Sequence, residues 1–221
     1  FEVNDAGTVH LGDFSFSNWY FTQYGKTEGE INVVKAIKRS NDIFFYKLAE
    51  KIGVNKLSEF AEKFGLGKNT GIDLIGEEEG TVPTEKWKKE TIGENWYLGD
   101  TYHYGIGQGY LLTTPMQVNL WTQAIANGGT IHKPHLLKNS KFEIRNSKFL
   151  SDETISLIRE GMIESCSTGG VAWPLFEFKV PASAKASAGK ESEIIKIACK
   201  TGTAQHGGDE TLPHAWITLF A

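Results

Sequence analysis

The sequence has little cysteine and no long hydrophobic run. Its two cysteines, Cys166 and Cys199, lie far apart in the chain and have no further cysteine or histidine at metal-ligand spacing. Neither a disulfide framework nor a zinc site can therefore be derived from them, and the redox compartment stays open. A membrane-spanning helix needs about 18 to 20 continuous apolar residues, and the chain contains no such run.

The charges form no block of one sign. The 221 residues include 23 basic and 27 acidic ones, which give a net charge of −4 and are scattered along the chain. This argues against nucleic acid as a partner and against a membrane-surface patch. With 40% apolar and 12% aromatic residues, the chain is long enough to bury a sizeable core.

The two ends of the sequence lack the usual features of a complete chain. It begins at Phe1 without an initiator methionine or the charged and apolar regions of a signal peptide, and it stops at Ala221 inside the apolar run "HAWITLFA". We therefore expect a chain that is truncated at both ends.

The first half predicts three closely joined helices between Ile31 and Gly65. The segments "INVVKAIKR", "IFFYKLAEKIG" and "NKLSEFAEKFG" have apolar residues at helical spacing. Asn55 is the expected N-cap of the third helix. Residues 1–30 are rich in aromatic residues and irregular in pattern, which indicates loops and short strands.

The second half predicts two further helices and a hairpin. Thr114 caps a helix that ends near Gly128, and Ser151 caps the next one. Residues 70–84 predict a short strand and a turn. The runs "IIKIACKTGTA" and "HAWITLFA" flank a glycine-containing turn and predict an antiparallel hairpin. The small, polar and charged residues 181–192 indicate a mobile surface loop.

Two short motifs are candidates for chemistry. The strand "IIKIACKTGTA" ends in a lysine, two threonines and a glycine, a composition that favours binding, although a strand end leading into a turn is the simpler alternative. Ser40, Asn41 and Asp42 stand between two predicted helices, where serine and aspartate commonly cap the incoming helix. Each motif alone can be explained structurally, as a strand end or as a helix cap. Their combination with "YGIGQGYLLTTPMQV" is more specific evidence for a functional site.

Together these segments resemble the transpeptidase domain of class B penicillin-binding proteins, most closely the penicillin-binding protein 2 branch that serves cell elongation. Ser40 and Asp42 match the Ser-x-Asn motif of this family in its Asp-bearing form. Residues 200–203 match its Lys-Thr/Ser-Gly-Thr strand. The segment "YGIGQGYLLTTPMQV" is similar to its Gly-Gln-Gly and Thr-Pro-x-Gln signature, and the resemblance runs across nearly the whole chain.

The resemblance implies an α+β, three-layer transpeptidase/β-lactamase-like fold, with a mainly antiparallel sheet, helices on both faces, and a cleft between the sheet edge and the helical lobe. Residues 1–221 would form part of one domain. We expect the nucleophilic Ser-x-x-Lys motif, a pedestal domain and a membrane anchor upstream of Phe1, and further strands after Ala221. Ser187 and Lys190 spell Ser-x-x-Lys, but they lie in the predicted loop and are interpreted as a coincidence.

The implied activity is that of a peptidoglycan D,D-transpeptidase at the extracytoplasmic face of the bacterial membrane. Its partners would be peptidoglycan stem peptides, β-lactam antibiotics, a membrane glycosyltransferase and other elongation proteins. The resemblance implies no cofactor and no metal. Two alternatives stay open, namely a β-lactamase or β-lactam sensor of the same fold, and a non-catalytic interaction module of the elongation complex.

The resemblance also assigns catalytic roles. Ser40 would relay a proton between the lysine of the nucleophile motif, Lys200 and the leaving group. Asp42 would orient this network, and we expect the neighbouring lysines to lower its pKa. Lys200 would keep the site electropositive and help to hold the terminal carboxylate of the substrate.

The last residues of the strand would bind substrate. Thr201 and Thr203 would donate hydroxyl hydrogen bonds to the carboxylate, and the Thr203 N–H would be one of two oxyanion donors. Gly202 has no Cβ, so a peptide can lie against the strand edge as an added strand. Cys199 alternates to the opposite face of the strand and is expected to be a small buried hydrophobic residue.

Overall fold

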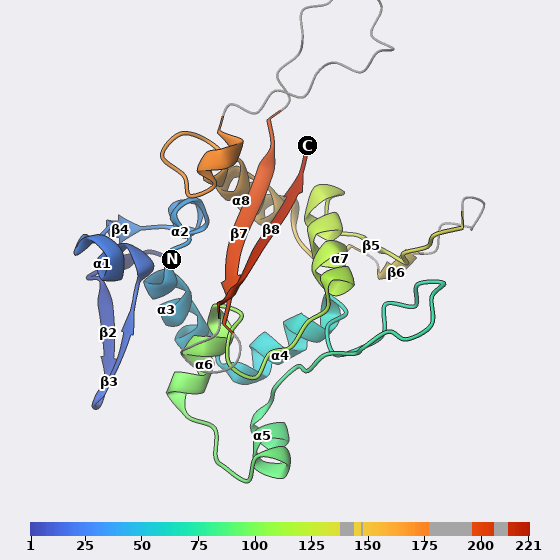
Figure 1. The fold of residues 1–221 in the computed structure, drawn as a ribbon, viewed down its shortest axis with the longest axis horizontal. Coiled ribbons are helices and arrows are strands. Elements are labelled where there is room, and N and C mark those ends of the chain that lie inside the picture. The colour runs from blue at the N-terminus through green and yellow to red at the C-terminus, as the bar shows by residue number, and fades with distance from the viewer. Residues whose placement is uncertain (138–143, 147, 177–195, 206–211) are drawn as a thin grey trace, which may run out of the picture.

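One long antiparallel hairpin lies at the centre of the molecule and is surrounded by helices (Figure 1). The computed structural model describes residues 1–221 except 138–143, 147, 177–195 and 206–211. Strands β7 (Ala198–Ala204) and β8 (His214–Phe220) form the hairpin, with Lys200 opposite Thr218. The predicted hairpin is confirmed, whereas the loop predicted at 181–192 lies outside the described residues.

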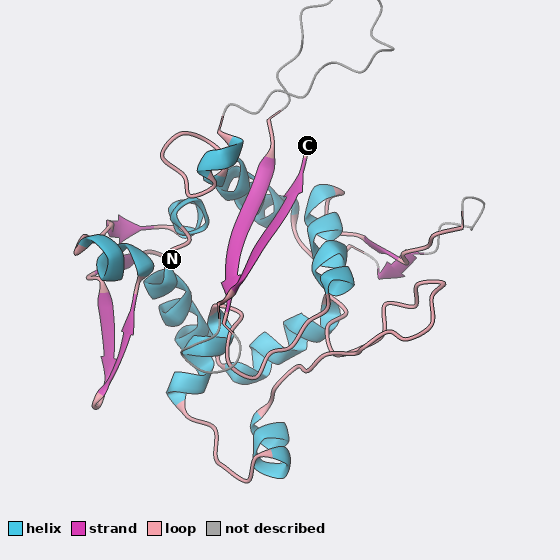
Figure 2. Ribbon diagram, viewed as in Figure 1, coloured by secondary structure: helices cyan, strands magenta, loops and turns pink. Residues whose placement is uncertain are grey.

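The other strands are short and lie at the periphery, as Figure 2 shows. All pairs are antiparallel, and the described residues contain four separate two-stranded sheets. The three peripheral pairs are β1 (Val3–Asp5) with β4 (Gly29–Ile31), β2 (Thr8–Leu11) with β3 (Phe14–Ser17), and β5 (Ile131–His132) with β6 (Ile144–Asn146). The predicted α+β class with antiparallel strands is confirmed.

The three closely joined helices are confirmed as α2 (Val33–Arg39), α3 (Asp42–Ile52) and α4 (Val54–Lys63). The prediction of Asn55 as a cap is wrong, because α4 begins one residue earlier and places Asn55 inside its first turn. Gly53, at φ 79°, both ends α3 and precedes α4. A glycine takes this positive φ without a steric penalty, and α4 begins without a side-chain cap.

The helices predicted in the second half are also confirmed. Helix α7 (Pro115–Ala126) starts at Thr114, whose hydroxyl accepts the Gln117 N–H. Helix α8 (Asp152–Ser165) is capped by Ser151 in the same way. In the described part of the chain, no helix is both long enough and apolar enough to cross a membrane.

Three shorter helices were not predicted, namely α1 (Trp19–Tyr24), α5 (Glu85–Thr91) and α6 (Leu98–Gly105). Each spans about two turns, which is too short to establish an apolar period. A short 3-10 helix, η1 (Trp173–Leu175), follows α8.

The strand predicted within residues 70–84 is absent from the structure, which has only an isolated bridge between Thr81 and Leu112 there. Side chains satisfy the backbone of this segment instead. The Glu77 carboxylate accepts the N–H groups of Thr70 and Gly71, and the Gln117 amide donates to the Lys68 and Glu79 carbonyls. The segment therefore folds as an ordered loop.

Both faces of β7 are covered at the first two residues of the strand. Ala198 and Cys199 point to opposite faces, and both are almost fully buried. On one face a cluster from α2, α7 and α8 packs against Ala198, formed by Ile37, Ile125, Ile155 and Met162. On the other face Cys199 packs with Cys166, Ala172 and Leu175 from the end of α8 and the segment after it. This packing fixes the position of Lys200, the next residue.

Cys166 and Cys199 form a disulfide, with their Cα atoms 5.8 Å apart. The expectation of a free hydrophobic Cys199 is therefore wrong, although the residue is buried as expected. The pairing depends on α8 returning its C-terminal end to β7, a long-range contact that two isolated cysteines in a sequence do not reveal. The bond ties the strand that carries Lys200 to α8.

Replacing both Cys166 and Cys199 with alanine should lower the free energy of unfolding by about 2–5 kcal/mol, because the cross-link restricts the unfolded chain. Urea denaturation of the oxidised protein and of the double variant measures this difference. A reductant should lower the stability of the wild type and leave the variant unchanged. Equal stability of the oxidised wild type and the variant would contradict the prediction.

Candidate active site

The two sequence motifs meet in space. The Lys200 ammonium donates a hydrogen bond of 2.8 Å to Ser40 Oγ, across 160 positions of the chain. It also donates to the carbonyl of Thr201 at 2.6 Å. Strand β7 therefore lies, at Lys200, against the turn between α2 and α3, and Figure 1 shows the hairpin at the centre of the helices.

Ser40 has a backbone conformation that frees its hydroxyl. It is the only non-glycine residue with positive φ in the described chain, at φ 49° and ψ 51°, and its N–H closes the end of α2. The N-cap of α3 is Asn41, whose side chain accepts the Phe44 N–H at 3.0 Å. The interpretation of Ser40 as a cap of the incoming helix α3 is therefore wrong, and Ser40 is the C-cap of α2. A left-handed conformation costs a non-glycine residue about 1–3 kcal/mol.

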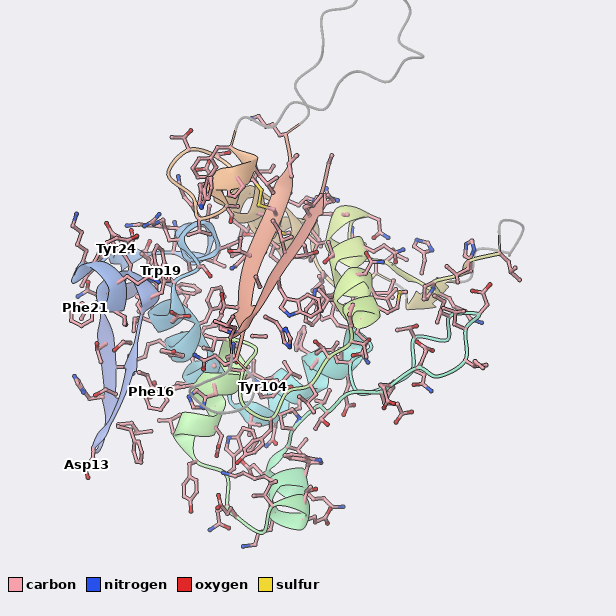
Figure 3. All side chains as sticks on the ribbon, in the orientation of Figure 1. Asp13, Phe16, Trp19, Phe21, Tyr24 and Tyr104 are labelled. Carbon is pink, nitrogen blue, oxygen red and sulfur yellow. A yellow bond between two sulfur atoms is a disulfide. The ribbon has the colours of Figure 1, made fainter. Side chains whose placement is uncertain are left out.

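Asp42 lies at the start of α3, and its carboxylate accepts the Trp19 N–H at 3.2 Å. Trp19 belongs to α1, and Figure 3 labels its side chain together with those of Phe21 and Tyr24 from the same helix. Burial raises the pKa of Asp42 to about 6, and the positive charge of Lys200 only partly offsets this effect. The expected lowering of its pKa is wrong, because the loss of solvation outweighs the attraction of one lysine.

Burial acts on Lys200 in the opposite direction. It lowers the pKa of the Lys200 ammonium to about 8, while the nearby Asp42 charge raises it. The two groups thus titrate much closer to each other than an exposed aspartate and lysine would. Between about pH 6 and pH 8, the carboxylate is mainly ionised and the ammonium mainly protonated.

The strand end beyond Lys200 is open. Gly202 and Thr203 are exposed and Thr201 is half-buried. A Cβ on Gly202 would meet only the Cβ of Trp216, at an ordinary 3.5 Å. Nothing within the described chain therefore requires a glycine here for packing.

The "YGIGQG" segment packs against this strand. The Gln108 amide donates to the carbonyl of Thr203 at 2.6 Å, and Gly107 and Gly109 on either side have positive φ. The sequence predicted no role for Gln108 itself, although this residue is part of the Gly-Gln-Gly signature. Ser187 and Lys190 lie outside the described residues. Among those described, no group of three histidine, cysteine or acidic residues is placed to hold a metal.

The chain belongs to the penicillin-binding protein transpeptidase domain family, whose model matches residues 1–221. Its curated relatives include the peptidoglycan D,D-transpeptidase MrdA of Escherichia coli K12, with 35% identity over 181 residues, which cover 80% of this chain and 28% of the relative. The Acinetobacter baumannii MrdA is 34% identical over 218 residues, 92% of this chain and 29% of the relative. The chain therefore spans less than a third of these relatives.

Solved structures support the assignment of the chain to this family. Penicillin-binding protein PBP2 from Helicobacter pylori matches with a TM-score of 0.81 and 34% identity, over 100% of this chain and 38% of that chain. Pseudomonas aeruginosa PBP2, solved in complex with WCK 5153, matches with a TM-score of 0.81 and 31% identity, over 100% of this chain and 48% of that chain. The resemblance to penicillin-binding protein 2 is confirmed.

The charge coupling of the site predicts a measurable change in pKa. Replacing Lys200 with methionine should raise the pKa of Asp42 further above 6, because the ammonium stabilises the ionised carboxylate. Carbon-13 NMR of the carboxyl group measures this pKa. Lys196→Met, an exposed lysine just before the same strand, is the matched control and should leave it unchanged. An unaltered Asp42 pKa in the Lys200 variant would contradict the coupling.

Proposed function

We propose that the intact protein is a peptidoglycan D,D-transpeptidase of cell-wall elongation that acts through an acyl-serine intermediate. In this proposal, the present chain supplies the proton relay and the substrate-binding strand edge. The observation that carries the proposal is the 2.8 Å contact between the half-buried Lys200 and Ser40, in a chain of this family.

The reaction requires a nucleophile, which the proposal places in a Ser-x-x-Lys motif of the full-length gene product. Its serine oxygen attacks the carbonyl carbon of the penultimate D-Ala, and an ester bond forms while the amide bond to the terminal D-Ala breaks. The serine proton passes to the motif lysine, and the leaving amine takes up a proton. An amine of a neighbouring stem peptide then attacks the ester, forms the cross-link and releases the serine.

Ser40 and Lys200 are suited to deliver the proton to the leaving amine. The ammonium already donates to the Ser40 hydroxyl, so Ser40 can pass its own proton on and receive another from Lys200. A general acid is most effective when its pKa lies near the working pH. Burial brings the pKa of Lys200 to about 8, which meets this requirement better than the ordinary lysine value.

Asp42 has a supporting electrostatic role in this proposal. Its negative charge raises the pKa of Lys200 against the effect of burial, so it keeps the ammonium protonated near neutral pH. Acylation should therefore increase as Asp42 ionises near pH 6 and decrease as Lys200 loses its proton near pH 8.

The open strand end is the proposed binding edge. The hydroxyls of Thr201 and Thr203 would hold the terminal carboxylate beside Lys200, and the Thr203 N–H would face the oxyanion. The exposed Gly202 leaves room for an extended peptide to lie along the edge. Gln108 supports this region through its hydrogen bond to the Thr203 carbonyl.

The proposed partners follow from related proteins. The H. pylori PBP2, 33% identical to this chain, has been solved in complex with MreC. A further chain, 27% identical, comes from a peptidoglycan synthase complex that coordinates polymerization and crosslinking. We propose that this protein likewise works in an elongation assembly with a glycosyltransferase, at the extracytoplasmic face of the membrane.

Acylation of the full-length gene product by a fluorescent penicillin tests the proposal. The wild type should form a stable adduct, and Lys200→Ala should slow its formation by at least about 10²–10³-fold, since it removes a preorganised charge. Lys196→Ala is the control and should acylate at the wild-type rate. Acylation of the Lys200 variant at that rate would contradict the proposed role. Rapid hydrolysis of the adduct would favour a β-lactamase, and no adduct in the wild type would favour the interaction module.

Ser40→Gly separates the chemical role of Ser40 from a structural one. Glycine accepts the left-handed conformation of residue 40, so the free energy of unfolding should stay within about 1 kcal/mol of the wild type or increase. Acylation should nevertheless fall by about 10²–10³-fold, because the relay hydroxyl is lost. Thermal unfolding and acylation rates of the full-length protein measure the two effects. A variant that acylates normally would show that Ser40 is not the relay.

A further inference from the structure

Asp5 is a buried carboxylate that the proposed mechanism does not use. It lies at the end of β1, its exposed fraction is 1%, and its described hydrogen-bond partners are four neutral N–H groups. Oδ1 accepts the Gly7 N–H at 2.7 Å. Oδ2 accepts from the Asn18 amide at 3.0 Å, the Glu28 N–H at 3.1 Å and the Asn41 amide at 2.7 Å.

These four donors come from segments that surround the candidate site. Gly7 lies in the turn between β1 and β2, and Glu28 lies just before β4. Asn18 and Asn41 are the N-caps of α1 and α3. One carboxylate therefore ties together two loops and the starts of two helices.

Asn41 connects this cluster directly to the site. It is fully buried and stands between Ser40 and Asp42 in the chain. Its oxygen caps α3 through the Phe44 N–H, while its NH₂ group donates to Asp5. An asparagine side chain can perform both tasks at once because it carries an acceptor and two donor hydrogens.

Asn18 provides a second connection. Its NH₂ group donates to Asp5, and its oxygen faces the backbone N–H of Asp42 at 3.4 Å. The next residue, Trp19, donates its own N–H to the Asp42 carboxylate. Asp5 thus holds both the backbone and the side chain of Asp42 through α1.

We infer that Asp5 is a positioning residue for the proposed reaction, which holds the turn of Ser40 and Asp42 in place through Asn41 and Asn18. The inference rests on the proposed function for its catalytic consequence. The left-handed conformation of Ser40 costs free energy, and the buried Asp5 cluster supplies the hydrogen bonds that retain it. Ser40 Oγ then stays within reach of Lys200.

The cluster requires a carboxylate. Three donors converge on Oδ2, and an amide at this position would place NH₂ against some of the N–H groups. A buried donor left without an acceptor costs about 1–3 kcal/mol. Asp5→Asn therefore changes the hydrogen bonding strongly while it keeps the shape of the side chain.

The charge of Asp5 also reaches Asp42. The groups whose charges interact with the Asp42 carboxyl are Lys200 on β7, Asp5 on β1 and Tyr46 on its own helix. Lys200 lowers the pKa of Asp42, whereas the like charge of Asp5 raises it. Removing the charge of Asp5 should therefore lower the pKa of Asp42.

Asp5→Asn in the full-length gene product tests the inference. Acylation by fluorescent penicillin should slow by about 10²-fold, because a displaced Ser40 misaligns the relay. The acid limb of the acylation profile should move to lower pH. Asp73→Asn is the matched control, because Asp73 is exposed and accepts two backbone N–H groups away from the site. It should change neither quantity.

A loss of thermal stability alone, with the wild-type acylation rate and an unchanged acid limb, would overturn the inference. If Asp5→Asn does not fold, Asn41→Ser replaces it, since serine can still cap α3 but lacks the amide that reaches Asp5. Its control is Asn32→Ser, which alters a similar cap at the start of α2. Slower acylation of Asn41→Ser alone supports the inference, and equal rates overturn it.

Failure of the proposed function gives a different result. The wild type would then form no adduct, whatever the state of Asp5. Hydrogen exchange of the Ser40 N–H, which closes the end of α2, would still decide whether Asp5 holds the turn. Faster exchange in Asp5→Asn, with no change in Asp73→Asn, would support this role, and an unchanged exchange rate would overturn it.

Discussion

The burial of Lys200 against the turn of Ser40 is the constraint on which the site depends. The half-buried Lys200 loses solvation, so its ammonium needs oxygen acceptors, here the Ser40 hydroxyl and the Thr201 carbonyl. This requirement fixes where β7 lies relative to α2 and α3. The disulfide at Cys199 and the helix core that packs on Ala198 hold the two residues of the strand just before Lys200.

The burial that positions the two charged groups also changes their chemistry. The loss of solvation moves the pKa values of both Asp42 and Lys200 towards neutral pH. The charge of each group partly opposes the shift in the pKa of the other. Such convergent shifts are typical of functional sites. A solvent-exposed aspartate and lysine would keep pKa values far apart and would exchange protons poorly near pH 7.

The sequence predicted the parts of this site that depend on local patterns. The helices on either side of Ser40 and the hairpin that carries residues 200–203 follow from periodicity and motifs. The pKa of Asp42 could not be predicted, because its burial is a product of tertiary packing, including the contact with Trp19 of α1, a helix too short to show a period. The disulfide likewise depends on how the end of α8 meets β7.

The cap at Asn41 shows how tertiary contacts decide between explanations that the sequence leaves open. Ser40, Asn41 and Asp42 are all residue types that cap helices, and local rules do not choose among them. Asn41 caps α3 because its amide is held by the buried Asp5. With the cap satisfied by Asn41, the Ser40 hydroxyl needs no partner in its own helix and is left to accept from Lys200. The hydrogen bond between Asn41 and Asp5 thus leaves the hydroxyl of the neighbouring Ser40 available for its proposed chemical role.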